Sequence, residues 1–161
     1  MDPLPPCGKP LRLHAPAPIV RPMSTLLSLG HGYSAQALAR RLVPQGWRVI
    51  GTTRTPAKAE AFRSDGVEPL IWPGDLGPAL AEATHILCSA APDSTGDPFL
   101  REAPEIAQSG AEWVGYLSTT GVYGDHGGGL VTEDTPLTPN TERGHKRLMA
   151  ETQWLDLWRN N

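Results

Sequence analysis

The chain has 161 residues, 14 lysines and arginines against 17 aspartates and glutamates, and a formal net charge of −3. This length suits one compact domain with a core, and the acidic balance gives no basic surface of the kind that binds nucleic acid. No apolar run approaches the ~20 residues that a membrane span needs. The two cysteines, Cys7 and Cys88, make no disulfide framework. We therefore expect a cytoplasmic protein in which Cys88 is a small buried side chain.

Residues 1–22 differ from the rest of the chain because they hold seven prolines and few apolar side chains. Such a composition cannot form a packed element, so this leader is expected to be disordered. It lacks the continuous apolar core of a signal peptide. One interpretation is that translation starts at Met23, directly before the first strand. The alternative is a targeting extension, for which Arg12 and Arg21 are the only support.

From Met23 to the end of the chain, expected strands alternate with expected helices. The order is strand Thr25–Leu29, helix Ser34–Val43, strand Trp47–Thr52, helix Pro56–Ser64, strand Glu68–Trp72, helix Leu76–Ala83, strand Thr84–Ser89, helix Phe99–Ser109, strand Glu112–Ser118, loop Thr119–Asn140 and helix Glu142–Trp158. Pro104 has to lie early in the fourth helix or kink it. The alternation predicts the α/β class, with a doubly wound parallel sheet of about five strands and helices on both faces.

The turn after the first strand carries the strongest functional motif. Its residues are Gly30-His31-Gly32-Tyr33-Ser34-Ala35, which have the G-x-G-x-x-A spacing of a dinucleotide-binding Rossmann fold. The first glycine permits the tight turn, the second lets the backbone approach a pyrophosphate, and the alanine lets the helix pack closely on the strand. Free N–H groups at the start of the helix would face the anion. His31 is expected to face the solvent or the cofactor.

The end of the second strand indicates which dinucleotide is bound. An NAD site usually has an acidic residue there for the ribose 2′-hydroxyl, but the stretch has Thr53 and Arg54, with Lys58 one helical turn further on. A guanidinium can bind a 2′-phosphate through two N–H groups, so the sequence favours NADP over NAD. The alternative is that Arg54 is a solvated surface charge. Asp75, after the third strand, would either accept a hydrogen bond from the adenine amino group or cap the following helix.

These residues resemble the extended short-chain dehydrogenase/reductase superfamily of nucleotide-sugar epimerases and dehydratases. The resemblance is closest to its small, atypical, epimerase-like branch and covers residues 24–151. The matching pieces after the glycine-rich turn are Gly74-Asp75-Leu76, Ser89-Ala90-Ala91-Pro92 and Ser118-Thr119-Thr120-Gly121-Val122-Tyr123-Gly124-Asp125. The resemblance implies that the first two pieces line the cofactor site and that Thr119, four residues before the tyrosine, hydrogen-bonds a substrate carbonyl or hydroxyl.

The chain departs from the family on its last helix, where the family carries Tyr-x-x-x-Lys. Gly144 and Glu151 fix a register that places Arg143 at the tyrosine position and Arg147 at the lysine position, and a shift by one position also provides no tyrosine. Arg147 is expected to keep the contact with the nicotinamide ribose. Arg143 cannot replace the phenol, because a guanidinium does not transfer protons at neutral pH.

Three other side chains are candidates for the missing proton carrier. Tyr123 follows the fifth strand near the expected substrate position, although the sequence favours a packed aromatic that anchors the loop. His145, on the last helix, titrates near neutrality, yet its position is typical of a surface residue. His126 has no obvious partner in the sequence. No spacing of His, Cys, Asp or Glu suggests a metal site, and no nucleophile elbow occurs.

The end of the chain is unusually apolar. Trp154, Leu155, Leu157 and Trp158 spread around the last helix, and they would need partners to be buried. The family continues into a further strand and a carboxyl-terminal substrate domain. The expectation is therefore a chain truncated to the cofactor-binding half, 23–161. The alternative is a homodimer formed through the last two helices.

Three functions remain open at this point. The chain is expected to be an NADP-dependent oxidoreductase or epimerase/dehydratase-like enzyme that acts by hydride transfer on a carbonyl or hydroxyl of a small-molecule substrate. The second hypothesis is a non-catalytic NADP(H)-binding or redox-sensing module, which the loss of Tyr-x-x-x-Lys favours. The third is an inactive fragment, whose unpaired fifth strand would promote association.

Overall fold

The protein is represented by a computed structural model that describes residues 24–159, so the predicted leader 1–22 and Cys7 lie outside the described residues. Five strands form one sheet in the order β3-β2-β1-β4-β5, and all four neighbouring pairs are parallel. The strands are β1 (Thr25–Leu29), β2 (Arg48–Thr53), β3 (Glu68–Ile71), β4 (His85–Cys88) and β5 (Trp113–Tyr116).

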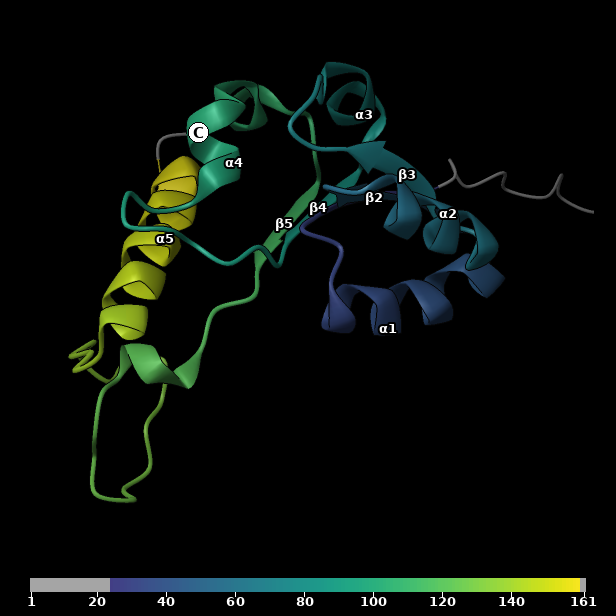
Figure 1. The fold of residues 1–161 in the computed structure, drawn as a ribbon. Helices are drawn as coiled ribbons and strands as arrows, with labels where there is room; N and C mark the ends of the chain where they lie inside the picture. Colours follow the sequence, from purple (N-terminus) through teal and green to yellow (C-terminus); the bar gives the residue numbers. More distant parts are fainter. Residues whose placement is uncertain (1–23, 160–161) are drawn as a thin grey trace, which may run out of the picture.

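Helices cover both faces of this sheet (Figure 1). They are α1 (Tyr33–Leu42), α2 (Pro56–Ser64), α3 (Gly77–Glu82), α4 (Pro98–Glu102) and α5 (Glu142–Arg159). Short 3-10 helices lie at Val43–Gln45, Pro104–Gln108 and Thr120–Val122. The structure confirms the doubly wound Rossmann fold that the alternating elements predict.

Alternation along the strands divides the core into two layers. Leu26 and Leu87 face α1 and α2, where Phe62 completes one apolar cluster. Leu27 and Ile86 face the opposite side and join a larger cluster with side chains of α3, α4 and α5. Strands covered on both faces are expected to be almost continuously apolar, as β1 is. Because the strands are parallel, the carboxyl ends of β1, β2 and β4 lie at one edge of the sheet, between these two layers.

The predicted single helix over Phe99–Ser109 is wrong. It is divided into α4 and the 3-10 helix Pro104–Gln108, and Ala103 between them has φ −135° and ψ 68°, outside the helical region. The proline ring disfavours a helical conformation at the residue before it. Asp97 starts α4 by accepting hydrogen bonds from the N–H groups of Phe99 and Leu100.

At least one large apolar side chain near the end of the chain is buried within the chain itself. Trp154 is buried, with its ring stacked 6.2 Å from that of Tyr116, whereas Leu155 is exposed. Strand β5 is an edge strand, and Trp113 and Val114 on it are both about half exposed. Cys88 is fully buried, as predicted, and burial raises the pKa of its thiol.

Two further findings concern residues 24–159 only. None of the helices in this range has both the length and the apolar character to cross a membrane. In the same range, His, Cys, Asp and Glu side chains do not gather in groups of three that would hold a metal ion.

Candidate functional site

The glycine-rich turn lies between the carboxyl ends of β1 and β4, where the winding of the sheet changes direction. Gly30 has φ +73°, a left-handed conformation that favours glycine. A Cβ atom at this position would lie 2.8 Å from the main-chain nitrogen of Ala90. Both the turn and the close approach of the β4 end therefore require glycine at position 30.

Hydrogen bonds fasten this turn to the strands on both sides. The N–H of Gly30 donates to Oγ1 of Thr52 on β2 (2.7 Å), and the N–H of His31 donates to the Thr52 carbonyl (3.3 Å). On the other side, the hydroxyl of Ser89 donates to the Gly30 carbonyl (2.5 Å). The turn is thus preorganised by both neighbouring strands, which reduces the ordering that an incoming ligand must impose.

The amino end of α1 is suited to an anion. Gly32 is the N-cap residue, so no side chain caps the helix, and its first turn contains no acidic residue. A Cβ at Gly32 would have Gly30 O as its nearest neighbour, at 3.7 Å, which leaves open space above the backbone. Uncapped N–H groups and the positive end of the helix dipole attract phosphate. The residues present therefore fit a pyrophosphate at this place.

His31 is not directed to the solvent, which corrects one part of the sequence expectation. Its side chain is buried, its Nδ1 lies 2.9 Å from Oγ of Ser28, and its ring meets that of Phe62 edge to face at 4.6 Å. Burial lowers the pKa of His31 to about 4, while the charge of Asp65 acts in the opposite direction. The imidazole is therefore neutral at pH 7 and adds no positive charge beside the turn.

A cleft of about 330 Å³ opens over this turn. Its lining joins the ends of β1, β2, β3 and β4 with the start of α2 and with α4. The lining residues are Gly30, His31, Gly32, Thr52, Thr53, Arg54, Thr55, Lys58, Phe62, Trp72, Ser89, Ala90, Ala91 and Phe99. None of these described residues is acidic, whereas Arg54 and Lys58 are cationic and exposed. The cleft is therefore electrostatically suited to an anionic ligand.

The end of β2 positions the two cationic residues. Thr53 is buried at the end of the strand, and Thr55 is the N-cap of α2, where its side chain accepts a hydrogen bond from the N–H of Lys58. Pro56 occupies the first turn of that helix, as is common at helix starts. The cap fixes where α2 begins, and so it fixes where Lys58 leaves the helix beside the cleft.

Five of the predicted cofactor residues do not line the cleft. Tyr33 and Ser34 are exposed on the first turn of α1, and Ala35 is completely buried beneath it. Asp75 accepts a hydrogen bond from the N–H of Gly77 (2.8 Å) at the start of α3, as its capping alternative predicts. Leu76 is completely buried in the core. The remaining nine predicted cofactor residues are brought together around the cleft.

The structure adds five lining residues that were not predicted as site residues. They are Thr52, Thr55, Phe62, Trp72 and Phe99. The two threonines were visible as hydroxyl residues flanking the end of the second strand. Trp72 and Phe99 stack at 4.6 Å at the boundary with the core, and no local pattern brings these two together.

None of the four predicted catalytic residues lines the cleft, but Arg147 hydrogen-bonds one residue that does. Its Nη1 donates to the carbonyls of Ala90 (3.2 Å) and Leu117 (3.0 Å) and to the hydroxyl of Tyr116 (3.1 Å). The guanidinium also lies over the Tyr116 ring, 5.6 Å from its centre. Its Nε is a buried nitrogen without a hydrogen-bond partner among the described residues. Arg147 therefore joins the ends of β4 and β5.

The other three predicted catalytic residues do not line the described cleft. Thr119 is half-buried and accepts a hydrogen bond from the N–H of Gly121 (3.3 Å). Tyr123 is half-buried in the same turn, and Arg143 is exposed on the first turn of α5. Their catalytic roles remain predictions.

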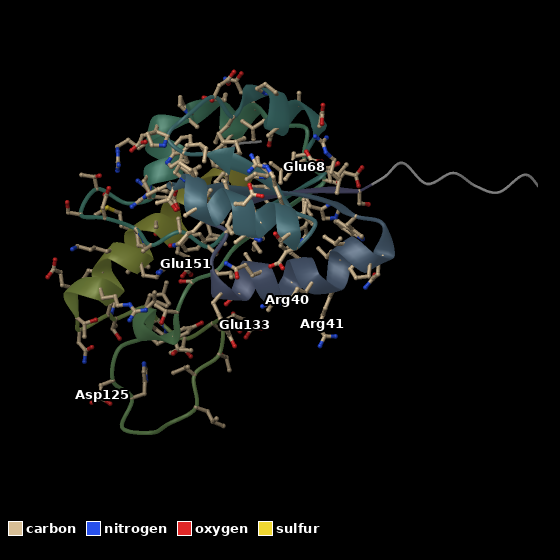
Figure 2. The ribbon with its side chains drawn as sticks, turned by 45° about the vertical axis from the view of Figure 1, so that its right-hand side comes forward. Arg40, Arg41, Glu68, Asp125, Glu133 and Glu151 are labelled. Atoms are coloured by element: carbon tan, nitrogen blue, oxygen red, sulfur yellow. The ribbon has the colours of Figure 1, made fainter. Side chains whose placement is uncertain are left out.

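The two remaining histidine candidates lie on the surface. His126 is exposed and hydrogen-bonds the Tyr123 carbonyl through Nε2 (3.0 Å), and His145 is exposed on α5. Figure 2 shows the surrounding loop, marked by Asp125, extending away from the sheet. The start of this loop is tied to the last helix, because the hydroxyl of Ser118 donates to Glu151 of α5 at 2.5 Å.

Comparisons with known proteins connect this geometry to one fold. A conserved protein of unknown function from Silicibacter pomeroyi is 56% identical, with a TM-score of 0.78 over 84% of this chain and 49% of that one. A UDP-glucose-4-epimerase from Stenotrophomonas maltophila, solved with bound NAD, is 21% identical with a TM-score of 0.63 over 86% of this chain and 49% of that one.

A dTDP-glucose 4,6-dehydratase from Bacillus anthracis, in complex with NAD, is 19% identical with a TM-score of 0.64 over 86% of this chain and 51% of that one. No protein-family model and no curated protein matches the chain. The chain spans about half the length of the solved proteins that it matches. Residues 24–159 thus share their fold with these nucleotide-sugar epimerases and dehydratases, as the motifs predict.

Proposed function

We propose that the chain binds a nicotinamide adenine dinucleotide in the cleft, with preference for NADP(H), and forms the cofactor-binding part of an oxidoreductase or epimerase/dehydratase-like enzyme. The observation that carries this proposal is the uncapped amino end of α1 beside a cleft without acidic lining residues, at the switch point of the sheet. Ligands of open α/β sheets bind at this position. The NAD bound by the epimerase and the dehydratase of the same fold supports the choice of ligand class.

The preference for NADP(H) is supported by the charges at the end of β2. Arg54 and Lys58 both line the cleft, and a carboxylate that would accept the ribose 2′-hydroxyl is missing from its described lining. A guanidinium and an ammonium both attract a 2′-phosphate, and the guanidinium can hold it through two N–H groups.

The chemistry of the proposed enzyme follows from the positions around the carboxyl ends of β4 and β5. When bound, the nicotinamide supplies or accepts a hydride. Arg147 holds the end of β4 through the carbonyl of Ala90, which lines the cleft, and the same guanidinium would contact the cofactor ribose. Thr119 would orient a substrate carbonyl or hydroxyl through its side-chain oxygen, at the start of the turn that follows β5.

Cofactor choice is tested by the charge at position 54. In fluorescence titrations of the full chain, NADPH is expected to bind tightly and well ahead of NADH. Arg54→Asp is expected to weaken NADPH binding roughly tenfold or more, because a charge-assisted hydrogen bond is replaced by repulsion. The same variant should leave NADH binding equal or improved.

Arg40→Asp is the matched control, because Arg40 is an exposed arginine on α1 outside the cleft lining (Figure 2). It makes the same charge change and is expected to alter the NADPH affinity less than twofold at physiological salt, where distant charges are screened. Equal effects of the two variants would show that Arg54 attracts the nucleotide only through net charge. No binding of either nucleotide by the wild type would contradict the proposed function.

Catalysis is tested by Thr119→Ala in a hydride-transfer assay with NADPH and a panel of carbonyl compounds. If Thr119 binds the reacting oxygen, kcat/KM should fall roughly tenfold or more, with unchanged NADPH affinity. Thr120→Ala, at the exposed neighbouring position, should have no effect. Unchanged activity in Thr119→Ala would remove this residue from the mechanism.

A non-catalytic NADP(H)-binding module is the second candidate function. It is favoured by the exposed position of Arg143 where the family has its tyrosine, and by the absence of Thr119 and Tyr123 from the described cleft lining. Tight NADPH binding without hydride transfer to any compound of the panel would support this candidate over the enzyme.

A further inference from the structure

We propose that His31 is a positioning residue whose neutral ring acts as a wedge beneath the glycine-rich turn, and that Gly51 is required because its missing Cβ leaves the space for this ring. The inference rests on the proposed nucleotide site and deepens it. It assigns a role in binding to a strand glycine that is outside the cleft lining.

The imidazole is enclosed by three different elements. Its Nδ1 meets the hydroxyl of Ser28 on β1 at 2.9 Å, and its ring packs edge to face on Phe62 of α2. On β2, a Cβ at Gly51 would lie 2.8 Å from Cγ and 3.1 Å from Cβ of His31. The ring therefore occupies the volume that any other residue at position 51 would fill.

The same residue is part of the turn through its main chain. The N–H of His31 donates to the carbonyl of Thr52, next to Gly51, and the His31 carbonyl accepts a hydrogen bond from the side chain of Gln36 on α1 (3.3 Å). Ring and main chain are thus held to β2 at adjacent positions. Displacing the ring must either move the turn away from Thr52 or push the ring into the cleft that it lines.

The wedge works by shape because the ring carries no charge at neutral pH. Burial lowers the pKa of His31 to about 4, and Asp65 is the charged group that acts on it in the opposite direction. An isolated glycine inside a strand is a common sign that another group approaches the backbone closely. Here the group that approaches Gly51 is the side chain of the turn that would receive the phosphates.

A double-mutant cycle tests the pair in four full-length proteins: wild type, Gly51→Ala, His31→Ala and the double variant. Dissociation constants for NADPH are measured by nucleotide fluorescence. Gly51→Ala is expected to weaken binding roughly tenfold, within the range of coupling for residues in contact. With alanine at position 31, the same glycine change should alter binding by less than about twofold, because the closest contact, to Cγ of the ring, is gone and only Cβ of residue 31 remains, at 3.1 Å.

Gly110→Ala is the matched control, because an added Cβ there meets no atom within 4 Å and the glycine has no positive φ. It should leave NADPH binding unchanged in both backgrounds. Val67 also lies 3.0 Å from the added Cβ of Gly51→Ala, so a small residual effect is expected in the double variant. Equal weakening by Gly51→Ala in both backgrounds would overturn the proposal.

Amide hydrogen exchange separates this inference from the proposed function. The N–H groups of Gly30 and His31 should exchange faster in Gly51→Ala than in the wild type and recover protection in the double variant, whether or not a nucleotide binds. If the wild type binds neither NADPH nor NADH but this pattern appears, the proposed function fails and the wedge stands. If the wild type binds NADPH and exchange in Gly51→Ala is unchanged, the wedge fails and the proposed function stands.

Discussion

Replacing Gly30 with alanine is expected to abolish NADPH binding and to lower the free energy of unfolding by about 2–5 kcal/mol. The left-handed backbone of Gly30 and the main chain of Ala90, 2.8 Å from the added Cβ, both oppose the substitution. The carbonyl of Gly30 also loses its geometry toward Ser89. Urea unfolding followed by circular dichroism gives the stability, and fluorescence titration gives the binding.

Two control glycines separate the causes. Gly46→Ala introduces a side chain at φ +84° with no atom within 4 Å, so it should cost about 1–2 kcal/mol for the backbone alone and leave binding intact. Gly32→Ala has room for its Cβ, so it should cost at most about 1 kcal/mol while blocking the pyrophosphate. If Gly30→Ala and Gly46→Ala lost the same free energy of unfolding, the close contact with Ala90 would not contribute to the destabilisation.

The sequence predicted the order of elements and the place of the turn because both depend on local patterns. Apolar strands, the glycine spacing and the helix starts are visible within about ten residues of each other. The position of Arg54 beside the cleft followed from its place at the end of a strand, since the carboxyl ends of parallel strands meet at one edge. The break at Pro104 also had a local signal, because a proline inside a helix kinks or ends it. The prediction nevertheless kept one helix.

The side-chain environment of the site depends on contacts between distant segments, which the patterns do not contain. His31 was expected at the solvent or the cofactor, because a histidine in a loop gives no sign that a ring on α2 will bury it. Gly51, in the middle of β2, was the available signal for a close approach. It did not say which side chain approaches. The sequence did not show which of the apolar tail residues finds a partner, and Trp154 donates a hydrogen bond to Asp97, 57 residues earlier.

Asp97→Ala is expected to destabilise the chain by about 3–5 kcal/mol, because this fully buried carboxylate accepts hydrogen bonds from three separated segments. It accepts from the N–H groups of Phe99 and Leu100 at the start of α4, and from Nε1 of Trp154 on α5 at 3.0 Å. The thiol of Cys88 is its fourth donor, at 3.2 Å. Alanine would leave these buried groups without an acceptor.

The substitution should also weaken the proposed site, since α5 carries Arg147 to the carbonyl of Ala90. NADPH affinity is therefore expected to fall in the fraction that stays folded, which titration at low temperature can measure. Asp134→Ala, at an exposed loop position, is the matched control and should change stability by less than about 0.5 kcal/mol. An Asp97→Ala protein within about 1 kcal/mol of the wild type in urea would show that α5 is held in place without this carboxylate. In that case the position of Arg147 would not depend on the buried carboxylate.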